Sequence, residues 1–192
     1  MDQLWSTVNG SPVVPTDQQI MAEYSAVSGY DPNTGANDNG CAMLDVMNRW
    51  RQVGLFGRQI GAYAAVTLHD HAEVADAVWL MGSVNAGVQL PLAWQGSATW
   101  DVPRRRLRFW QHFQWQPGSW GGHDVPIVSY DQNYLYAVTW GQVVRITWAA
   151  WDAYFVEAYV AIDALWVNGT KPAPSGFDLS TLMADLQAIG AA

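Results

Sequence analysis

A histidine and a tryptophan stand near the two ends of the segment GGHDVPIVSYDQNYLYAVTWG, residues 121–141. Imidazole changes its charge between pH 5 and 8, so a histidine beside open backbone and an aromatic ring has the setting of a general base. Gly121 and Gly122 leave space in front of His123, and Trp140 lies close to the end of the segment. A histidine that only packs against tryptophan fits the same spacing at least as well, so both interpretations stay open.

The elements that would hold His123 and Trp140 can be predicted from the residues between them. Three strands are expected, over residues 123–130, 134–140 and 143–149. The turn formers at 131–133 would make the first two strands a hairpin, with His123 opposite Trp140 and its neighbours. The third strand would extend the hairpin into a meander.

Cys41 is the single cysteine and therefore the candidate nucleophile of this chain. We predict a helix from Cys41 to about Val53 that is capped by Asp38 or Asn39. A thiol in the first turn of a helix has its thiolate stabilised by backbone N–H groups and the helix dipole, whereas the carboxylate of Asp38 would oppose it. The sequence favours a half-buried structural cysteine over a catalytic one, and a lone cysteine excludes an internal disulfide.

Two segments have some features of metal sites. The HDH sequence at 69–71 carries two imidazoles, but Asp70 is placed as a helix cap and no further ligands recur at ligand spacing. The loop beginning at Asp31 starts like a calcium loop, yet Ala36 replaces the required glycine and Ala42 the bidentate glutamate. We therefore predict no metal and no cofactor.

Further helices and strands follow from capping signals and apolar spacing. Helices are predicted over residues 16–27, where Thr16 and Gln19 form a capping box, over 70–82, near 151–159 and over 178–189. Strands are predicted over 60–68, over 87–94 and near 160–166. Helices come mostly first and strands mostly late, which is typical of the α+β class.

Composition bounds the class of protein. The chain has 192 residues, half of them apolar and twelve of them tryptophan, which predicts one aromatic-rich globular domain over 1–192. A net charge of −8 with nine basic residues argues against a nucleic acid partner, although four arginines fall within residues 104–108. Charged residues interrupt the apolar stretch 134–166, so we expect no membrane span. The N-terminus does not resemble a signal peptide.

The later half resembles the papain-like cysteine peptidases, in which Gly-His, a strand, a turn and a strand precede Asn-Ser-Trp-Gly. The corresponding residues here are GGHDV at 121–125 and VTWG at 138–141. The resemblance implies that His123 would take the thiol proton and that Trp140 would shield the histidine. The position of the orienting asparagine falls on Val138 or, counted without gaps from His123, on Thr139.

A branch of this family from actinobacteria and their phages is similar over nearly the whole chain. The segments that carry this similarity are PTDQQIMAEYSAVSGYDPNTG, DNGCAMLDVMNRWRQVGLFG, GAYAAV, GVQLPLAW, GGHDVPIVSYD and VTWG. The resemblance implies a papain-like α+β fold with N-terminal helices and a C-terminal antiparallel sheet. It also implies a Gly-Asp-Cys nucleophile motif that would precede Met1, so the central helix is expected to be truncated.

These observations lead to two hypotheses about function. The first is a catalytically degenerate papain-like protein that acts as a structural or binding subunit of a phage or prophage particle, with a protein partner or self-assembly and a location in the cytoplasm or the virion. The alternative is an active cysteine peptidase or thiol hydrolase that uses Cys41 or an upstream cysteine with His123. Trp120, Thr139 and Trp140 are the candidate binding residues around the histidine. An aromatic carbohydrate-binding groove is a third possibility, which the tryptophan content alone supports.

Overall fold

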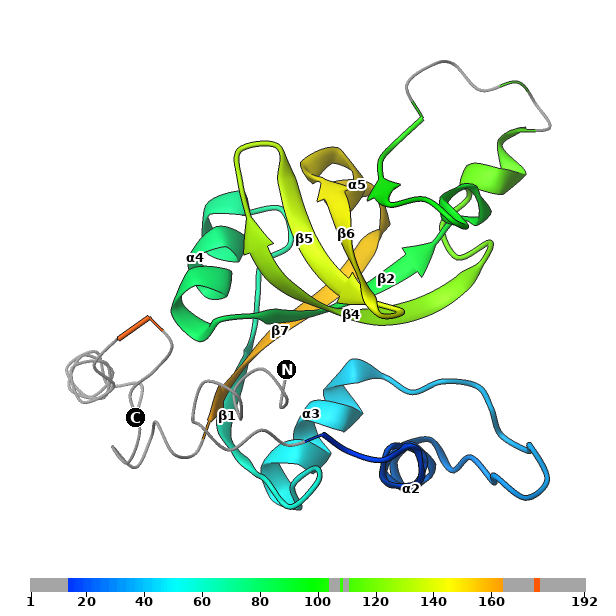
Figure 1. The fold of residues 1–192 in the computed structure, drawn as a ribbon, viewed down its shortest axis with the longest axis vertical. Helices are drawn as coiled ribbons and strands as arrows, with labels where there is room; N and C mark the ends of the chain where they lie inside the picture. Colours follow the sequence, from blue (N-terminus) through cyan, green and yellow to red (C-terminus); the bar gives the residue numbers. More distant parts are fainter. Residues whose placement is uncertain (1–13, 104–107, 109–110, 164–174, 177–192) are drawn as a thin grey trace. The chain divides into compact units, whose positions relative to one another are not determined.

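The computed structural model describes residues 14–103, 108, 111–163 and 175–176. The chain divides into two compact units, residues 1–63 with 161–192 and residues 64–160, and the elements are drawn in Figure 1. The single domain predicted over 1–192 stays a prediction. The predicted terminal helix over 178–189 lies outside the described residues, and so does the arginine run except for Arg108.

Helix α2 (Asp17–Ser28) confirms the first predicted helix and its capping box. The Thr16 hydroxyl accepts a hydrogen bond from the Gln19 backbone N–H at 3.3 Å, and the Gln19 side chain accepts one from the Thr16 N–H at 2.9 Å. The helix ends at Gly29, whose φ of 76° is in the left-handed region that favours glycine. These signals are local in sequence, which is why the prediction succeeded.

Helix α3 (Met43–Gln52) begins later than predicted. Its N-cap is Ala42, which makes no side-chain capping bond, and Asp38 instead accepts a hydrogen bond from the Tyr24 hydroxyl at 2.7 Å. The prediction that Asp38 or Asn39 caps a helix starting at Cys41 is therefore wrong. Met43, Met47 and Trp50 of the helix are buried, whereas Leu44, which has a similar spacing, is 42% exposed.

A sheet of seven strands runs in the order β1-β7-β2-β4-β5-β6-β3. The strands are β1 (Ile60–Ala65), β2 (Val84–Leu90), β3 (Thr99–Trp100), β4 (Gly121–Tyr130), β5 (Tyr134–Thr139), β6 (Gln142–Thr147) and β7 (Phe155–Asp163). Strand β4 pairs antiparallel with β2 and β5, β5 pairs antiparallel with β6, and β3 pairs parallel with β6. The predicted meander of three late strands is confirmed, and β4 is the long curved strand beside β5 in Figure 1.

Two strand predictions need correction. Strand β2 begins at Val84 and ends at Leu90, and residues Leu92–Trp94 form a short 3-10 helix (η1) after Pro91 instead of continuing the strand. Proline lacks the N–H that a strand ladder needs, so Pro91 explains why β2 ends at Leu90. A second 3-10 turn, η3 (Phe113–Trp115), precedes β4. Strand β1 also ends earlier than the predicted strand over 60–68.

Helix α4 (His71–Met81) agrees with its sequence signals, whereas α5 (Trp148–Tyr154) does not. The α4 cap is Asp70, which accepts from the Glu73 N–H at 3.0 Å. Helix α5 starts at the expected end of a strand because Thr147 caps it, accepting from the Ala150 N–H at 3.1 Å. The predicted helix near 151–159 therefore ends at Tyr154, and strand β7 follows without a loop.

Pairing with β2 explains why residues after Tyr154 form a strand. In β7, Ala158 lies opposite Ala86 and Tyr159 opposite Asn85. Phe155, Ala158 and Val160 of β7 are buried in the same core cluster as the residues of β2. Long-range pairing of this kind outweighs local helix propensity.

One face of the sheet forms the core with α4 and α5. Its buried strand residues are Val84, Ala86, Val88, Val125, Ile127, Leu135, Ala137, Val144 and Ile146. Val74 and Val78 of α4 and Trp151 of α5 belong to the same cluster. Across the described ranges, no helix is long and apolar enough to cross a membrane.

Val144 and Val143 allow a matched test of this core. Val144 is fully buried and Val143 is 58% exposed on the same strand. We expect Val144→Ala to lower the free energy of unfolding by about 1–3 kcal/mol because it removes buried methyl groups and leaves a cavity. Val143→Ala should change it by only about 0.5 kcal/mol or less. Equal effects of the two variants on urea unfolding would contradict this assignment of the faces.

Candidate functional site

His123 and Thr139 meet on neighbouring strands of the sheet. His123 is on β4, and its Nε2 atom forms a hydrogen bond with the Thr139 hydroxyl on β5 at 2.8 Å. His123 is half-buried, and it shares the inner face of β4 with the buried residues Val125 and Ile127 because strand side chains alternate. The sheet therefore brings together the predicted histidine and one of the two residues that the sequence offered as its partner.

Val138 is not placed to contact the histidine in the same way. It is 42% exposed, whereas Thr139 is 7% exposed and points to the core side. A hydroxyl group can either donate to a ring nitrogen or accept from a ring N–H, so Thr139 can serve both tautomers of His123. In the described part of the chain, no other hydrogen bond of the His123 ring is found.

Trp140 covers one face of the imidazole. The two rings are stacked with centroids 4.6 Å apart and an angle of 4° between their planes. Trp140 has a φ of 46°, uncommon for a residue other than glycine, and together with Gly141 it forms the turn that ends β5. The ring remains 55% exposed, so Trp140 shields His123 and also presents an aromatic surface to solvent.

A row of aromatic rings connects this site with the core. Trp120 lies 5.1 Å from Trp140, and Trp100 meets Trp140 edge-on at 6.4 Å between centroids. Trp94 stacks on Trp100 at 4.9 Å and contacts Tyr154 at 4.6 Å. Trp94 and Trp100 were not selected by sequence reasoning, because the twelve tryptophans carry no local signal that separates core from surface.

The backbone in front of the histidine is open. A Cβ atom built on Gly121 or Gly122 would meet no heavy atom within 4 Å. Gly121 also has a φ of 129°, a conformation that other residues rarely adopt. Both glycine positions therefore face open space.

Burial lowers the pKa of His123 below its ordinary value of 6.5, because the charged imidazolium loses hydration beside the aromatic rings. A base whose pKa falls on folding binds protons more tightly in the unfolded chain. His123 thus contributes stability that is present above the ordinary pKa and is lost as the pH falls through the folded pKa. The site favours a neutral imidazole at pH 7.

Cys41 belongs to the unit of residues 1–63 and 161–192, and His123 belongs to the unit of residues 64–160. Cys41 is exposed and precedes Ala42, the N-cap of α3. Its predicted place in the first turn of the helix is wrong, since the helix starts at Met43. The argument for a thiolate stabilised by first-turn N–H groups therefore does not apply to Cys41.

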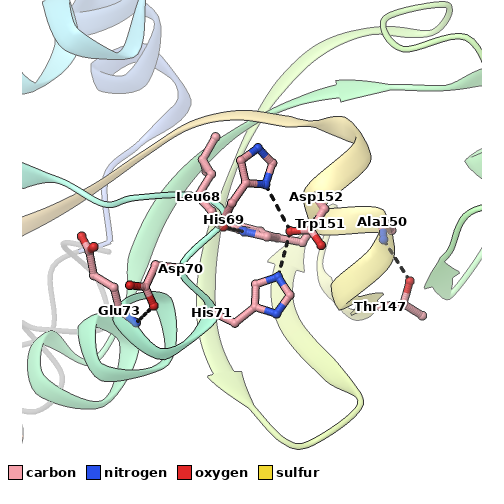
Figure 2. Close-up of polar contacts among 9 residues, drawn as sticks. All are labelled: Leu68, His69, Asp70, His71, Glu73, Thr147, Ala150, Trp151 and Asp152. Atoms are coloured by element: carbon pink, nitrogen blue, oxygen red, sulfur yellow. Dashed lines mark hydrogen bonds and ion pairs between the residues drawn. The ribbon is translucent and has the colours of Figure 1, made fainter.

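The HDH segment forms a polar cluster with α5, which Figure 2 shows in close-up. Oδ1 of Asp152 lies 2.8 Å from Nε2 of His71 and 3.4 Å from Nδ1 of His69. Asp70 caps α4, as predicted. Across the ranges that the structure covers, no group of three or more histidine, cysteine, aspartate or glutamate residues is arranged to hold a metal ion.

Comparison with known proteins shows the fold. No family model matches the chain, and no curated protein matches it. Among solved structures it is similar to xylellain, a cysteine protease from Xylella fastidiosa, with a TM-score of 0.61 and 10% sequence identity over 84% of this chain and 75% of that one. The predicted papain-like α+β fold is confirmed, and a similarity at this identity shows the fold alone.

The shielding of His123 by Trp140 can be tested by NMR titration of the imidazole. We expect Trp140→Ala to raise the His123 pKa towards its ordinary value, because water would then reach the charged ring. Trp79→Ala is the matched control, since Trp79 is 60% exposed on α4. An unchanged His123 pKa in Trp140→Ala, or an equal rise in both variants, would contradict the conclusion that Trp140 shields the imidazole from water.

Proposed function

We propose that this chain is a catalytically degenerate papain-like protein that acts as a binding or structural subunit. The observation that carries this proposal is the position of Cys41. The single cysteine is exposed and precedes the N-cap of α3, so it lies outside the helical turn in which a nucleophilic thiol was expected. A histidine has no thiol proton to accept unless a reactive thiol lies within hydrogen-bond reach.

The partner of His123 supports the same proposal. A carboxamide oxygen can only accept, so it holds an imidazole in the tautomer whose other nitrogen can take a proton. The Thr139 hydroxyl, 2.8 Å from Nε2, can also donate and so does not select that tautomer. Such an arrangement keeps the histidine well packed without committing it to the role of a base.

The surface around the site supports a role in binding. Val138, Trp140 and Val143 are exposed by 42%, 55% and 58%, respectively, and Val138 and Val143 are direct cross-strand partners. Exposed apolar and aromatic side chains that cluster together are typical of interfaces.

We propose a protein partner or self-assembly, in a phage or prophage particle. The assignment to a particle rests on the similarity of the sequence to the phage branch.

An active thiol hydrolase is the second candidate, and the geometry of His123 favours it. The imidazole is held by a stacked ring, and the two residues before it in the sequence carry no side chain. A peptide-bond cleft would lie near Trp120 and His123, with His123 accepting the proton of Cys41 or of a cysteine upstream. The neutral imidazole that burial favours is the form that can accept a proton.

Alkylation of Cys41 separates the two candidates. A thiol that is not activated by its surroundings reacts slowly near pH 6, because the thiolate is the reactive form. For a degenerate protein we expect slow iodoacetamide labelling near pH 6, measured by intact mass, at the same rate in wild type and His123→Ala. His112→Ala is the matched control, because His112 is exposed and lies outside the hydrogen bond and ring stack of His123.

Fast labelling that His123→Ala slows at least about tenfold, and that His112→Ala leaves unchanged, would indicate an activated thiol and overturn the proposal. Peptide hydrolysis that is lost in His123→Ala would do the same. The protein from its native source should be weighed in parallel. A mass that includes further N-terminal residues with a second cysteine would favour the hydrolase.

A further inference from the structure

Two histidines share one carboxylate oxygen at the junction of α4 and α5. Figure 2 shows the rings of His69 and His71 on either side of Asp152, each joined to the same Oδ1 atom. The distances are 3.4 Å from His69 Nδ1 and 2.8 Å from His71 Nε2. The side chains of His69, His71 and Asp152 are 73%, 42% and 41% exposed, so protons of the solvent reach all three.

Neighbouring contacts hold the same segment against α5. The ring of His71 stacks on Trp148 with centroids 4.4 Å apart. The indole N–H of the buried Trp151 donates to the Leu68 carbonyl at 2.7 Å. The histidines therefore sit at a packed junction between the start of α4 and α5, where a change in their contact with Asp152 is transmitted to both helices.

The charged and titratable groups around the imidazoles come from three elements. Asp152 is on α5, and Asp70 and Glu73 are in the first turn of α4, where Asp70 caps the helix and Glu73 accepts from the Thr67 N–H at 2.9 Å. Asp131 lies on the turn between β4 and β5, and its carbonyl accepts from the Trp148 indole N–H.

We propose that His69, His71 and Asp152 form a proton-sensitive contact that fastens the start of α4 to α5 more tightly in mildly acidic than in mildly alkaline solution. A neutral imidazole makes an ordinary hydrogen bond to Asp152. A protonated imidazole makes a charge-assisted bond, which is shorter and stronger. The contact is therefore strongest when the imidazoles carry a proton and Asp152 carries its negative charge.

Hydrogen exchange of the backbone amides tests this inference locally. Peptides covering residues 66–76 and 146–156 report the opening of the two helix ends, where the Val74 N–H is bonded to the Asp70 carbonyl and the Ala150 N–H to Thr147. Asp152→Asn keeps a hydrogen-bond acceptor and removes the charge. The ratio of exchange rates, variant over wild type, is measured at pH 5.5 and pH 8.0 in the presence of EDTA. Comparing two proteins at one pH cancels the intrinsic pH dependence of exchange.

We expect the ratio to be about two- to fivefold larger at pH 5.5 than at pH 8.0. The matched control Asp76→Asn removes one carboxylate from the exposed face of α4 and should give equal ratios at both pH values. A ratio for Asp152→Asn that is equal at the two pH values, or larger at pH 8.0, would overturn the proposal.

A second variant keeps Asp152 and removes the titrating groups. His69→Gln combined with His71→Gln should abolish the pH-dependent part of the protection while the remainder of the unit exchanges as in wild type. If the pH dependence at residues 66–76 persists in this double variant, another group is responsible and the proposal is wrong. The outcome does not depend on whether the chain is a binding protein or a hydrolase.

Discussion

The antiparallel pairing of β4 with β5 is the constraint on which the candidate site depends. His123 lies on one strand and Thr139 on the other, so their hydrogen bond exists only in this register. The turn after β5 then turns Trp140 back so that its ring covers the imidazole. The site is a consequence of how two neighbouring strands are aligned and where one of them ends.

Aromatic packing makes that alignment rigid. Trp100 and Trp94 are almost fully buried, and their rings link Trp140 with Tyr154 of α5. Large rings contribute much buried area for the few dihedral angles that they immobilise. The residue that covers the histidine is thereby in contact with the core, although its own outer face is exposed.

The histidines of the unit of residues 64–160 illustrate how surroundings decide chemistry. His123 is half-buried among aromatic rings, and its neutral form is favoured. His69 and His71 are more exposed and face the carboxylate of Asp152. A papain-like fold accommodates both, which is why the fold alone does not determine activity.

The sequence by itself determined the features that depend on a few neighbouring residues. The capping box at Thr16 and the Asp70 cap were predicted because the groups that form them lie within four residues of one another. The meander of β4, β5 and β6 followed from strand patterns separated by short turns. The papain-like fold was predicted from the motifs GGHDV at 121–125 and VTWG at 138–141, which lie in β4 and at the end of β5.

The tertiary structure decided the features that depend on pairing between distant residues. Strand β7 forms because β2 lies beside it. Helix α3 begins after Cys41, and the Asp38 carboxylate accepts a hydrogen bond from Tyr24 instead of capping the helix. The choice between Val138 and Thr139 depends on a register shift between β4 and β5 near residues 127–129. One extra residue in a strand moves the partner strand's side chains to the opposite face. Sequence spacing does not reveal such a shift, because it arises from how the two strands align.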